Sequence, residues 1–291
     1  EPVSPLFSTM EQTALTLELQ VAQEYTGHQI DLCYLAPMWR EILDHRLEGP
    51  DLGPKLHESL DSITAVANTG DDPNWFGNDL AAANLYCYGR LAWDPELDGD
   101  AILDEWLSLT YALEPETQRT IRAMLSTSRE TYELYTAPLG IGWMVKTHLH
   151  YGPGVNDYEY DRWGTYHRAD REAIGVERTA AGTGYAELYP EAWAEYYSSL
   201  ESCPDELVLF FHRLSYTQIL HSGTSVIQHI YDSRFEGYER VLAYQAEWAN
   251  LEGKLPASSY ANVSERLERQ RQNAREWRDQ VNSFFYRLSG I

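Results

Sequence analysis

The 291-residue sequence has few basic side chains, few cysteines and no long apolar run. Only 22 Lys and Arg residues stand against 45 Asp and Glu, which gives a formal net charge of -23. A surface this negative repels phosphate groups, so we expect no nucleic-acid partner and no binding to a membrane surface. No apolar stretch approaches the roughly 20 residues that span a bilayer. The apolar content of 43% still allows a large core, in one big domain or two ordinary ones.

The three cysteines, Cys33, Cys87 and Cys203, are too few and too widely spaced for a disulfide framework or a zinc-binding motif. Asn262-Val263-Ser264 is an N-glycosylation sequon. Together with the acidic composition, this sequon at Asn262 favours an extracellular protein. The sequence begins at Glu1 without an initiator Met, so we expect further sequence upstream in the natural protein.

Motifs of nucleotide, metal and serine-hydrolase sites are missing. There is no GxGxxG, Walker loop, HExxH, CxxC or GxSxG sequence, so we expect no cofactor and no metal. His148 and His150 lie two residues apart and could ligate a metal, but no cysteine or carboxylate accompanies them. Hydrogen bonds from these histidines to the backbone are the favoured interpretation.

The first 78 residues follow a strand and helix rhythm. Apolar and polar residues alternate from Leu15 to Glu24, which predicts a strand. A helix is expected over 30–45, a second strand over 62–67 and a polar loop over 68–78. This order is typical of parallel βα units. Because two strands cannot form a stable sheet alone, we expect the end of a larger α/β domain.

Beyond Asn78 the periodicity is helical almost to the end of the chain, so the predicted fold class is mainly α. A long irregular stretch over 137–168, rich in Gly, His, Tyr and Trp, interrupts the helices and is typical of a functional loop. The predicted domains are the end of an α/β unit over 1–78 and a helical domain over 79–291. The helices are expected over 79–93, capped by Asn78, and over 101–113, 115–135, 190–200, 204–214, 226–251 and 259–288.

The remaining candidates for chemistry are carboxylates and aromatic residues. Glu24 lies on the polar side of the first strand, at its carboxyl end, which is the catalytic end of a strand in a βα barrel. Asn74 and Trp75 follow the second strand and would offer a hydroxyl partner and an aromatic platform to a sugar. The simpler interpretation is that Glu24 is a solvated charge and Trp75 a packing residue.

Seven sequence blocks resemble the α-glucuronidases of glycoside hydrolase family 67, in the same order and over essentially the whole chain. The resemblance implies the last two strands of a (β/α)8 barrel followed by a large helical domain. The blocks are EPVSPLF at 1–7, LELQVAQEYTG at 17–27, CYLAPMW at 33–39, NTGDDPNWFG at 68–77, ANLYCYGRLAWDP at 83–95, HYGPG at 150–154 and YHRADREAIGVERT at 166–179.

The same resemblance implies an inverting glycoside hydrolase that releases (4-O-methyl)glucuronic acid from α-1,2-linked xylo-oligosaccharides derived from glucuronoxylan. Glu24 matches a carboxylate on the basic side of that reaction. The family's partner Asp, its general acid and the cations that hold the uronic carboxylate would lie upstream of Glu1. We therefore expect this chain alone to be inactive, and the missing N-terminal part to be its partner.

The resemblance also implies that the helical domain reaches the aglycone sugars and forms a homodimer. Trp163 is the candidate residue for contact with the aglycone sugars, and the alternative is that Trp163 is a buried structural residue. His167 and Arg168 are candidates near the substrate, or helix-capping residues like Asp170.

The last helices are rich in aromatic residues, which favours a dimer interface. The alternative is that these residues fill the domain's own core. The rival function is a non-catalytic helical module for dimerisation or xylan binding. The aromatic residues are Trp248, Trp277, Phe284, Phe285 and Tyr286.

Overall fold

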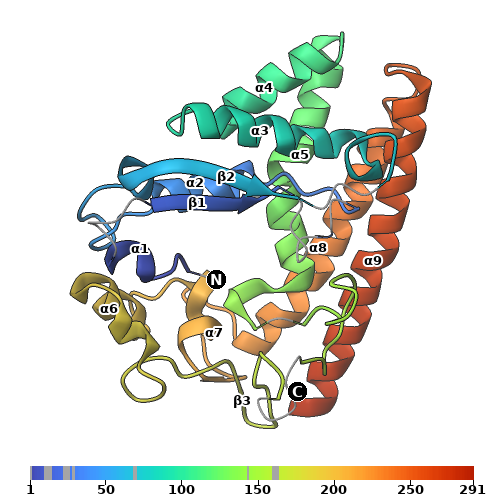
Figure 1. Ribbon diagram of the computed structural model, residues 1–291. Helices are drawn as coiled ribbons and strands as arrows, with labels where there is room; N and C mark the ends of the chain where they lie inside the picture. Colours follow the sequence, from blue (N-terminus) through green and yellow to red (C-terminus); the bar gives the residue numbers. More distant parts are fainter. Residues whose placement is uncertain are drawn as a thin grey trace.

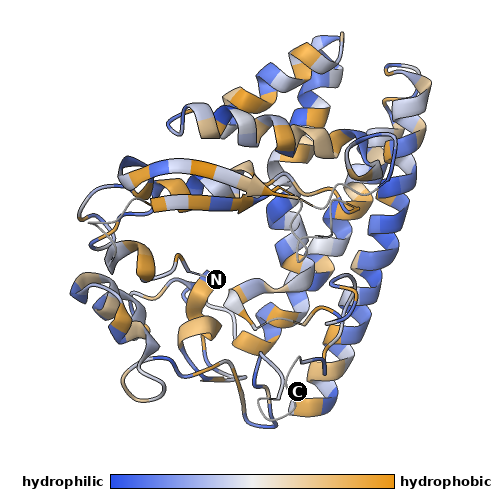
Figure 2. Cartoon of the chain, viewed as in Figure 1, coloured by the Kyte–Doolittle hydropathy of each residue, from blue (hydrophilic) through white to orange (hydrophobic). Residues whose placement is uncertain are grey.

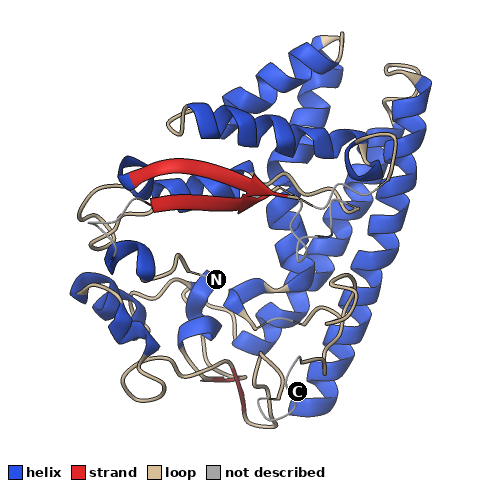
Figure 3. Ribbon diagram, in the orientation of Figure 1, coloured by secondary structure: helices blue, strands red, loops and turns tan. Residues whose placement is uncertain are grey.

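The computed structural model describes residues 2–9, 15–21, 27, 30–67, 71–142, 144–158 and 164–291. The chain is mainly α-helical, as predicted, and its strands are few (Figure 3). A two-stranded sheet lies beside three long helices, α5 (Pro115–Thr136), α8 (Val226–Ala249) and α9 (Ala257–Ser289) (Figure 1). No helix within the described ranges has an apolar segment long enough to cross a membrane.

Strands β1 (Leu15–Gln20) and β2 (Leu60–Val66) pair in parallel, with Leu17 opposite Ile63. The leucines of β1 are buried and the polar residues between them are exposed, which confirms the predicted alternation over 15–20. The rest of the predicted strand, over 22–24, lies outside the described residues. The hydropathy of both strands changes from residue to residue in Figure 2. One face of this sheet therefore packs on the core, while its polar face carries a hydrogen bond of 2.7 Å between Thr16 Oγ1 and Ser62 Oγ.

The helix between the strands, α2 (Ala36–Asp44), is shorter than the predicted range of 30–45. Pro37 lies in its first turn, where a missing backbone N–H costs nothing. Residues 32–35 are not helical, because most of their backbone N–H and C=O groups form hydrogen bonds with side chains of distant helices. Trp39 and Leu43 of α2 are fully buried in the main core.

The helical part contains α3 (Ala82–Trp93) and α4 (Gly99–Thr110) in addition to α5, α8 and α9. These five helices confirm the predicted ones to within a few residues. Asn78 accepts a hydrogen bond of 3.1 Å from the Leu80 amide and caps the turn that leads into α3. Asp98 caps α4 by accepting 2.9 Å from the Ala101 amide, which moves the start of that helix ahead of the predicted residue.

The irregular stretch extends further than predicted, up to helix α6 (Glu191–Ser198). The predicted helix over 204–214 is wrong, because only a 3-10 turn and the short α7 (Val208–Phe211) form there. The Arg178 amide donates to the Phe211 carbonyl at 2.8 Å, so this chain pairs with a neighbouring segment instead of continuing the helix. Short strands β3 (Ala173–Ile174) and β4 (Leu214–Ser215) complete an antiparallel pair that the sequence pattern did not reveal.

A small aromatic cluster forms the core of the region around α6 and α7. Tyr197 stacks between Trp193 and Phe211, with ring centroids 5.1 and 4.3 Å away. The Trp193 Nε1 atom donates 2.7 Å to the Arg46 carbonyl, and its ring stacks on His45 at 4.7 Å. The short N-terminal helix α1 (Leu6–Thr9) lies nearby and is tied down by the Ser8 hydroxyl, which donates to the Leu47 carbonyl. The cluster thus attaches the α6–α7 region to the α/β part of the chain.

The aromatic residues of the last two helices mostly fill the chain's own core. Trp248, Trp277 and Phe285 are 2%, 2% and 0% exposed, and Phe284 packs against the core. Tyr286 of α9 and Phe235 of α8 are exposed, at 64% and 49%. Most of these aromatic side chains therefore belong to the chain's own core, and the homodimer stays a prediction.

Candidate functional site

The carboxyl ends of β1 and β2 point toward α5, α8 and α9 (Figure 1). Side chains that follow parallel strands at this end share one edge of the sheet. Glu24, the predicted catalytic carboxylate, and Trp163 lie outside the described residues. The described chain includes Gly27 and resumes at Ile30, whose amide donates 2.8 Å to the Gly27 carbonyl. The candidate site is therefore built from the residues that surround this connection.

Asp31 is the central charged group at this edge. It is 1% exposed and accepts three hydrogen bonds from three different parts of the chain. Tyr135 of α5 donates to Oδ2 at 2.8 Å, Asn273 of α9 donates to Oδ2 at 2.6 Å, and Tyr151 donates to Oδ1 at 3.0 Å. We call these four residues the Asp31 cluster.

Burial raises the pKa of the Asp31 carboxyl from 3.8 to about 6, although the three hydrogen bonds and the charge of Arg269 act in the opposite direction. A titrating carboxyl near a strand end is a candidate acid or base. Asp31, however, is buried too deeply to touch a sugar. Its geometry favours a role in holding the chain.

The residues after Asp31 are bound by amide and hydroxyl side chains of the long helices. Gln270 of α9 contacts Leu32 twice, accepting 3.0 Å from its amide and donating 3.3 Å to its carbonyl. Asn84 of α3 accepts 2.8 Å from the Leu35 amide and donates 2.9 Å to the Cys33 carbonyl. Ser128 of α5 accepts 2.8 Å from the Tyr34 amide. Gln270, Asn84 and Ser128, which we call the side-chain cradle, thus satisfy backbone groups of residues 32–35 that no helix or strand partner satisfies.

The loop after β2 places Asn74 and Trp75 differently from the prediction. Asn74 Nδ2 donates to the Asp79 carboxylate, so this amide holds its own loop. Trp75 is half-buried, packs against the main core and meets the edge of Phe76 at 4.8 Å. Trp75 is therefore not the exposed platform that was expected, and the packing interpretation is the one that the structure favours.

Helix α9 anchors this loop through Asn262 and Arg266. Asn262 accepts 2.9 Å from the Asp79 amide and donates 3.0 Å from Nδ2 to the Gly77 carbonyl. Arg266 Nε donates 2.6 Å to the same carbonyl. Gly77 has a left-handed φ of 67°, and an added Cβ would collide with the side chains of Arg266 and Asp72, so a substitution there would be strained. These bonds give Asn262 a structural role, and its glycosylation stays a prediction, because a glycosylated Nδ2 keeps one N–H that can still donate to Gly77.

His167 does not reach the surface. It is 1% exposed, its Nε2 lies 2.8 Å from the Val155 carbonyl, and its Nδ1 accepts 3.0 Å from the Ala169 amide. These contacts require a neutral ring with the proton on Nε2, and burial lowers the pKa of His167 accordingly. His167 therefore offers no ring nitrogen at the surface, and its place near the substrate stays a prediction.

Arg168 and Asp170 follow His167 in a turn. Arg168 is exposed, so its side chain remains a candidate for substrate contact. Asp170 accepts 2.9 Å from the Glu172 amide and 3.0 Å from the Ala173 amide, and Arg213 donates to it at 2.6 Å. The prediction that Asp170 caps a helix is wrong, because its turn leads into strand β3.

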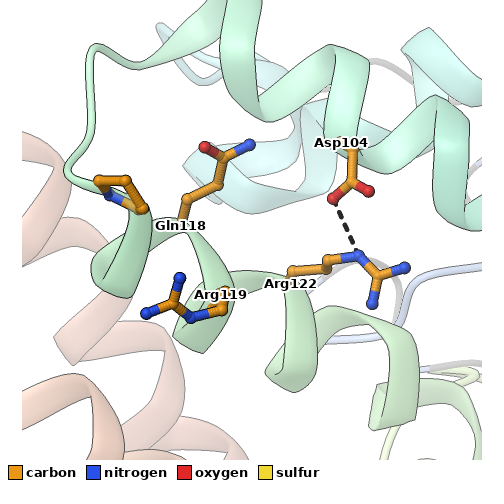
Figure 4. Close-up of a pocket in the computed structure, with 5 residues that line it drawn as sticks. Asp104, Gln118, Arg119 and Arg122 are labelled. Carbon is orange, nitrogen blue, oxygen red and sulfur yellow. Dashed lines mark ion pairs between the residues drawn. The ribbon is translucent and has the colours of Figure 1, made fainter.

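Two shallow hollows lie elsewhere on the surface. One is lined by Lys146, His148, Asp157 and Gln280. The other lies between α4 and α5, where Arg122 Nε forms an ion pair of 2.8 Å with Asp104 (Figure 4). Neither hollow contains a predicted site residue. Among the described residues, no group of three His, Cys, Asp or Glu side chains is placed to hold a metal.

Sequence reasoning missed the Asp31 cluster and the cradle. One signal was available: Gln270 lies on the same helix face as Leu267, Ala274 and Trp277, which are all buried. A polar residue on a buried stripe needs a hydrogen-bond partner, which predicts a specific contact. Tyr151 could also have been selected as a candidate residue, because it lies in one of the blocks that carry the family resemblance.

The chain matches two models of one enzyme family. Residues 76–291 match the model described as Glycosyl hydrolase family 67 C-terminus, and residues 1–75 match the model described as Glycosyl hydrolase family 67 middle domain. The two matches meet three residues before the predicted domain boundary, which lies after Asn78. The chain belongs to glycosyl hydrolase family 67, which confirms the resemblance.

Curated fungal proteins match the whole chain. A probable alpha-glucuronidase A of Aspergillus flavus is 41% identical over 302 aligned positions, covering 100% of this chain and 36% of that protein. The alpha-glucuronidase A of Emericella nidulans is also 41% identical, and that of Aspergillus tubingensis is 40% identical, with the same coverage. The chain thus spans 36% of the length of these relatives.

Proposed function

We propose that this chain is part of an α-glucuronidase and supplies the last two strands of its (β/α)8 barrel and a helical domain over 79–291. The observation that supports this most is the place of Glu24, four residues after Gln20, the last residue of parallel strand β1. Carboxyl ends of strands form the catalytic face of such barrels. The relatives named alpha-glucuronidase match this chain over its full length.

The proposed reaction is inverting hydrolysis of the α-1,2 bond between (4-O-methyl)glucuronic acid and xylose in glucuronoxylan-derived oligosaccharides. Glu24 acts on the basic side and deprotonates the attacking water. A general acid protonates the xylose oxygen from the opposite side, roughly 6.5 to 9.5 Å away. That acid belongs to the upstream part of the enzyme, which is the partner that this chain needs. Asp31 is not the base, because it is 1% exposed.

Replacement of Glu24 tests the proposal in the full-length protein. Glu24→Ala should lower kcat by about three orders of magnitude or more and leave KM within a few-fold, because a water-activating base acts on the transition state. Azide should rescue the variant and yield the β-configured azide. Glu247→Ala, on the exposed side of α8, is the matched control. A near-normal kcat in Glu24→Ala would overturn the assignment, as would a wild-type protein that releases no glucuronic acid.

The alternative, a non-catalytic helical module, is not favoured, because the alpha-glucuronidases named above match both the 1–75 and the 76–291 portions. The helical domain still has a proposed role in substrate binding. We place Trp163 against the xylose next to the scissile bond. Trp163→Ala should then reduce kcat/KM about five- to tenfold for aldotriouronic acid but not for an aryl glucuronide. Equal losses on both substrates would assign Trp163 a structural role.

A homodimer and an extracellular location complete the proposal. Light scattering of the full-length protein at micromolar concentration should show a dimer, and a monomer alone would refute it. Recovery of the protein from the culture medium of its host, rather than from the cells, would support export. The glycan expected at Asn262 is tested by intact mass before and after enzymatic deglycosylation.

A further inference from the structure

The chain that leaves β1 is attached to the helical part of the protein by polar contacts. Three elements meet at Asp31: α5 through Tyr135, α9 through Asn273 and the 144–158 loop through Tyr151. All three donate to one carboxyl group, so the position of Asp31 depends on all of them. A buried polar network of this kind is sensitive to geometry, because every lost partner leaves a donor or acceptor unsatisfied.

The contacts on both sides of Asp31 extend this attachment. On the C-terminal side, the cradle bonds to residues 32–35. On the N-terminal side, the Asp31 amide donates 3.2 Å to the Gly27 carbonyl, and Gly27 has a left-handed φ of 76°. An added Cβ at Gly27 would lie 2.7 Å from the Asp31 Cβ and 3.0 Å from the Tyr132 ring. Gly27 and residues 31–35 are thus packed directly against the helical part of the chain.

We infer that Asp31 is a positioning residue, which fixes the chain at the carboxyl end of β1 through hydrogen bonds from α5, α9 and the 144–158 loop. Under the proposed function, on which this inference rests, Glu24 lies three residues before Gly27 in that chain. Displacement of a reacting group by about 1 Å can lower a rate a hundredfold. The helical domain would then control the rate of the chemical step as well as the binding of sugars.

Two conservative variants test the inference in the full-length protein. Tyr151→Phe removes one donor to Asp31 and keeps the ring, while Asp31→Asn removes the charge and keeps an acceptor. Tyr244→Phe is the matched control. Its hydroxyl bonds to Thr127 at 2.8 Å and to Thr131 at 2.7 Å, at the contact between α5 and α8. All three variants lose or weaken buried hydrogen bonds, so their melting temperatures should fall by comparable amounts.

The kinetic parameters separate positioning from general stability. With aldotriouronic acid as substrate, Tyr151→Phe and Asp31→Asn should lower kcat about tenfold or more and keep KM within about threefold. Tyr244→Phe should keep both parameters near the wild-type values. If Tyr244→Phe lowers kcat as much as the other two, or if neither variant at the Asp31 cluster lowers it, the inference is overturned.

Hydrogen exchange provides a readout that does not depend on activity. The amides of Ile30, Asp31 and Leu32 should exchange several-fold faster in Tyr151→Phe than in wild type, and at the wild-type rate in Tyr244→Phe. A wild-type protein without activity would refute the proposed function but leave this comparison intact. Unchanged exchange of these amides in both Asp31-cluster variants would refute the positioning role itself.

Discussion

Gln270 and Leu32 are 238 positions apart in the sequence, yet the Gln270 amide group bonds to both the backbone amide and the carbonyl of Leu32, at 3.0 and 3.3 Å. The Gln270 side chain is fully buried. A glutamine in this arrangement supplies one acceptor and one donor to the backbone of a single residue, as a neighbouring strand does in a sheet. The last helix of the chain thus stabilises the segment between β1 and α2.

Gln270→Met should reduce the free energy of unfolding by about 2 to 4 kcal/mol. Methionine has a similar volume but leaves two buried backbone groups of Leu32 without partners. The matched control is Gln245→Met, because the half-buried Gln245 donates to Glu268 at 3.0 Å at the protein surface, and loss of this bond should cost below about 1 kcal/mol. Denaturant unfolding measures both values. Equal losses in the two variants would show that the contact with Leu32 contributes nothing special.

Asp31 should make the protein less stable as the pH rises from about 4 to 6. The folded state raises the pKa of this carboxyl from 3.8 to about 6, so between these values the native state holds a proton that the unfolded state has released. The stabilising contribution is complete below pH 3.8 and is lost as the pH rises through 6. The shift between these two pKa values corresponds to about 3 kcal/mol of unfolding free energy.

The measurement is the unfolding free energy of Asp31→Asn minus that of wild type, taken from pH 4 to pH 7. The difference should rise by about 2 kcal/mol over this range, because the variant lacks the titrating group. Contributions from other carboxylates cancel in the subtraction. A difference that stays constant with pH would show that the pKa of Asp31 is not raised.

His167 should have the opposite dependence on pH. Burial lowers the pKa of His167 from its ordinary value of 6.5. Just below pH 6.5 the imidazole is therefore protonated in the unfolded state but still neutral in the native state. The contribution of His167 to stability is therefore complete above pH 6.5 and is lost as the pH falls below it.

His167→Gln tests this dependence. At pH 8 the variant should be less stable than wild type by about 1 to 2 kcal/mol, because it loses the acceptor for the Ala169 amide and the ring contacts with Phe284 and Phe285. The difference in unfolding free energy between wild type and variant should decrease as the pH falls from 7 to 5, because only wild type loses the contribution of His167. Unfolding curves at four pH values would show this trend, and a gap that widens toward acid would contradict it.

The sequence by itself determined the helical character of the chain and most of its long elements. The strand over 15–20 follows from strict alternation, and the long helices follow from apolar spacing with local signals such as Pro115 and Asn78. These signals work because they act between residues that are close in the chain. Seven matching blocks also indicated the family, which the family models confirmed.

Only the tertiary structure decided what the polar residues of those elements do. His167 looked like a site residue and is buried against phenylalanines, while Asn262 looked like a glycan acceptor and bonds to the Gly77 carbonyl. Asp31 gave no signal, because its partners Tyr135, Tyr151 and Asn273 lie 104, 120 and 242 residues away. Periodicity reports which side of an element faces apolar surroundings. Which polar groups meet there depends on how distant elements pack, and that packing also sets the pKa of a buried carboxyl.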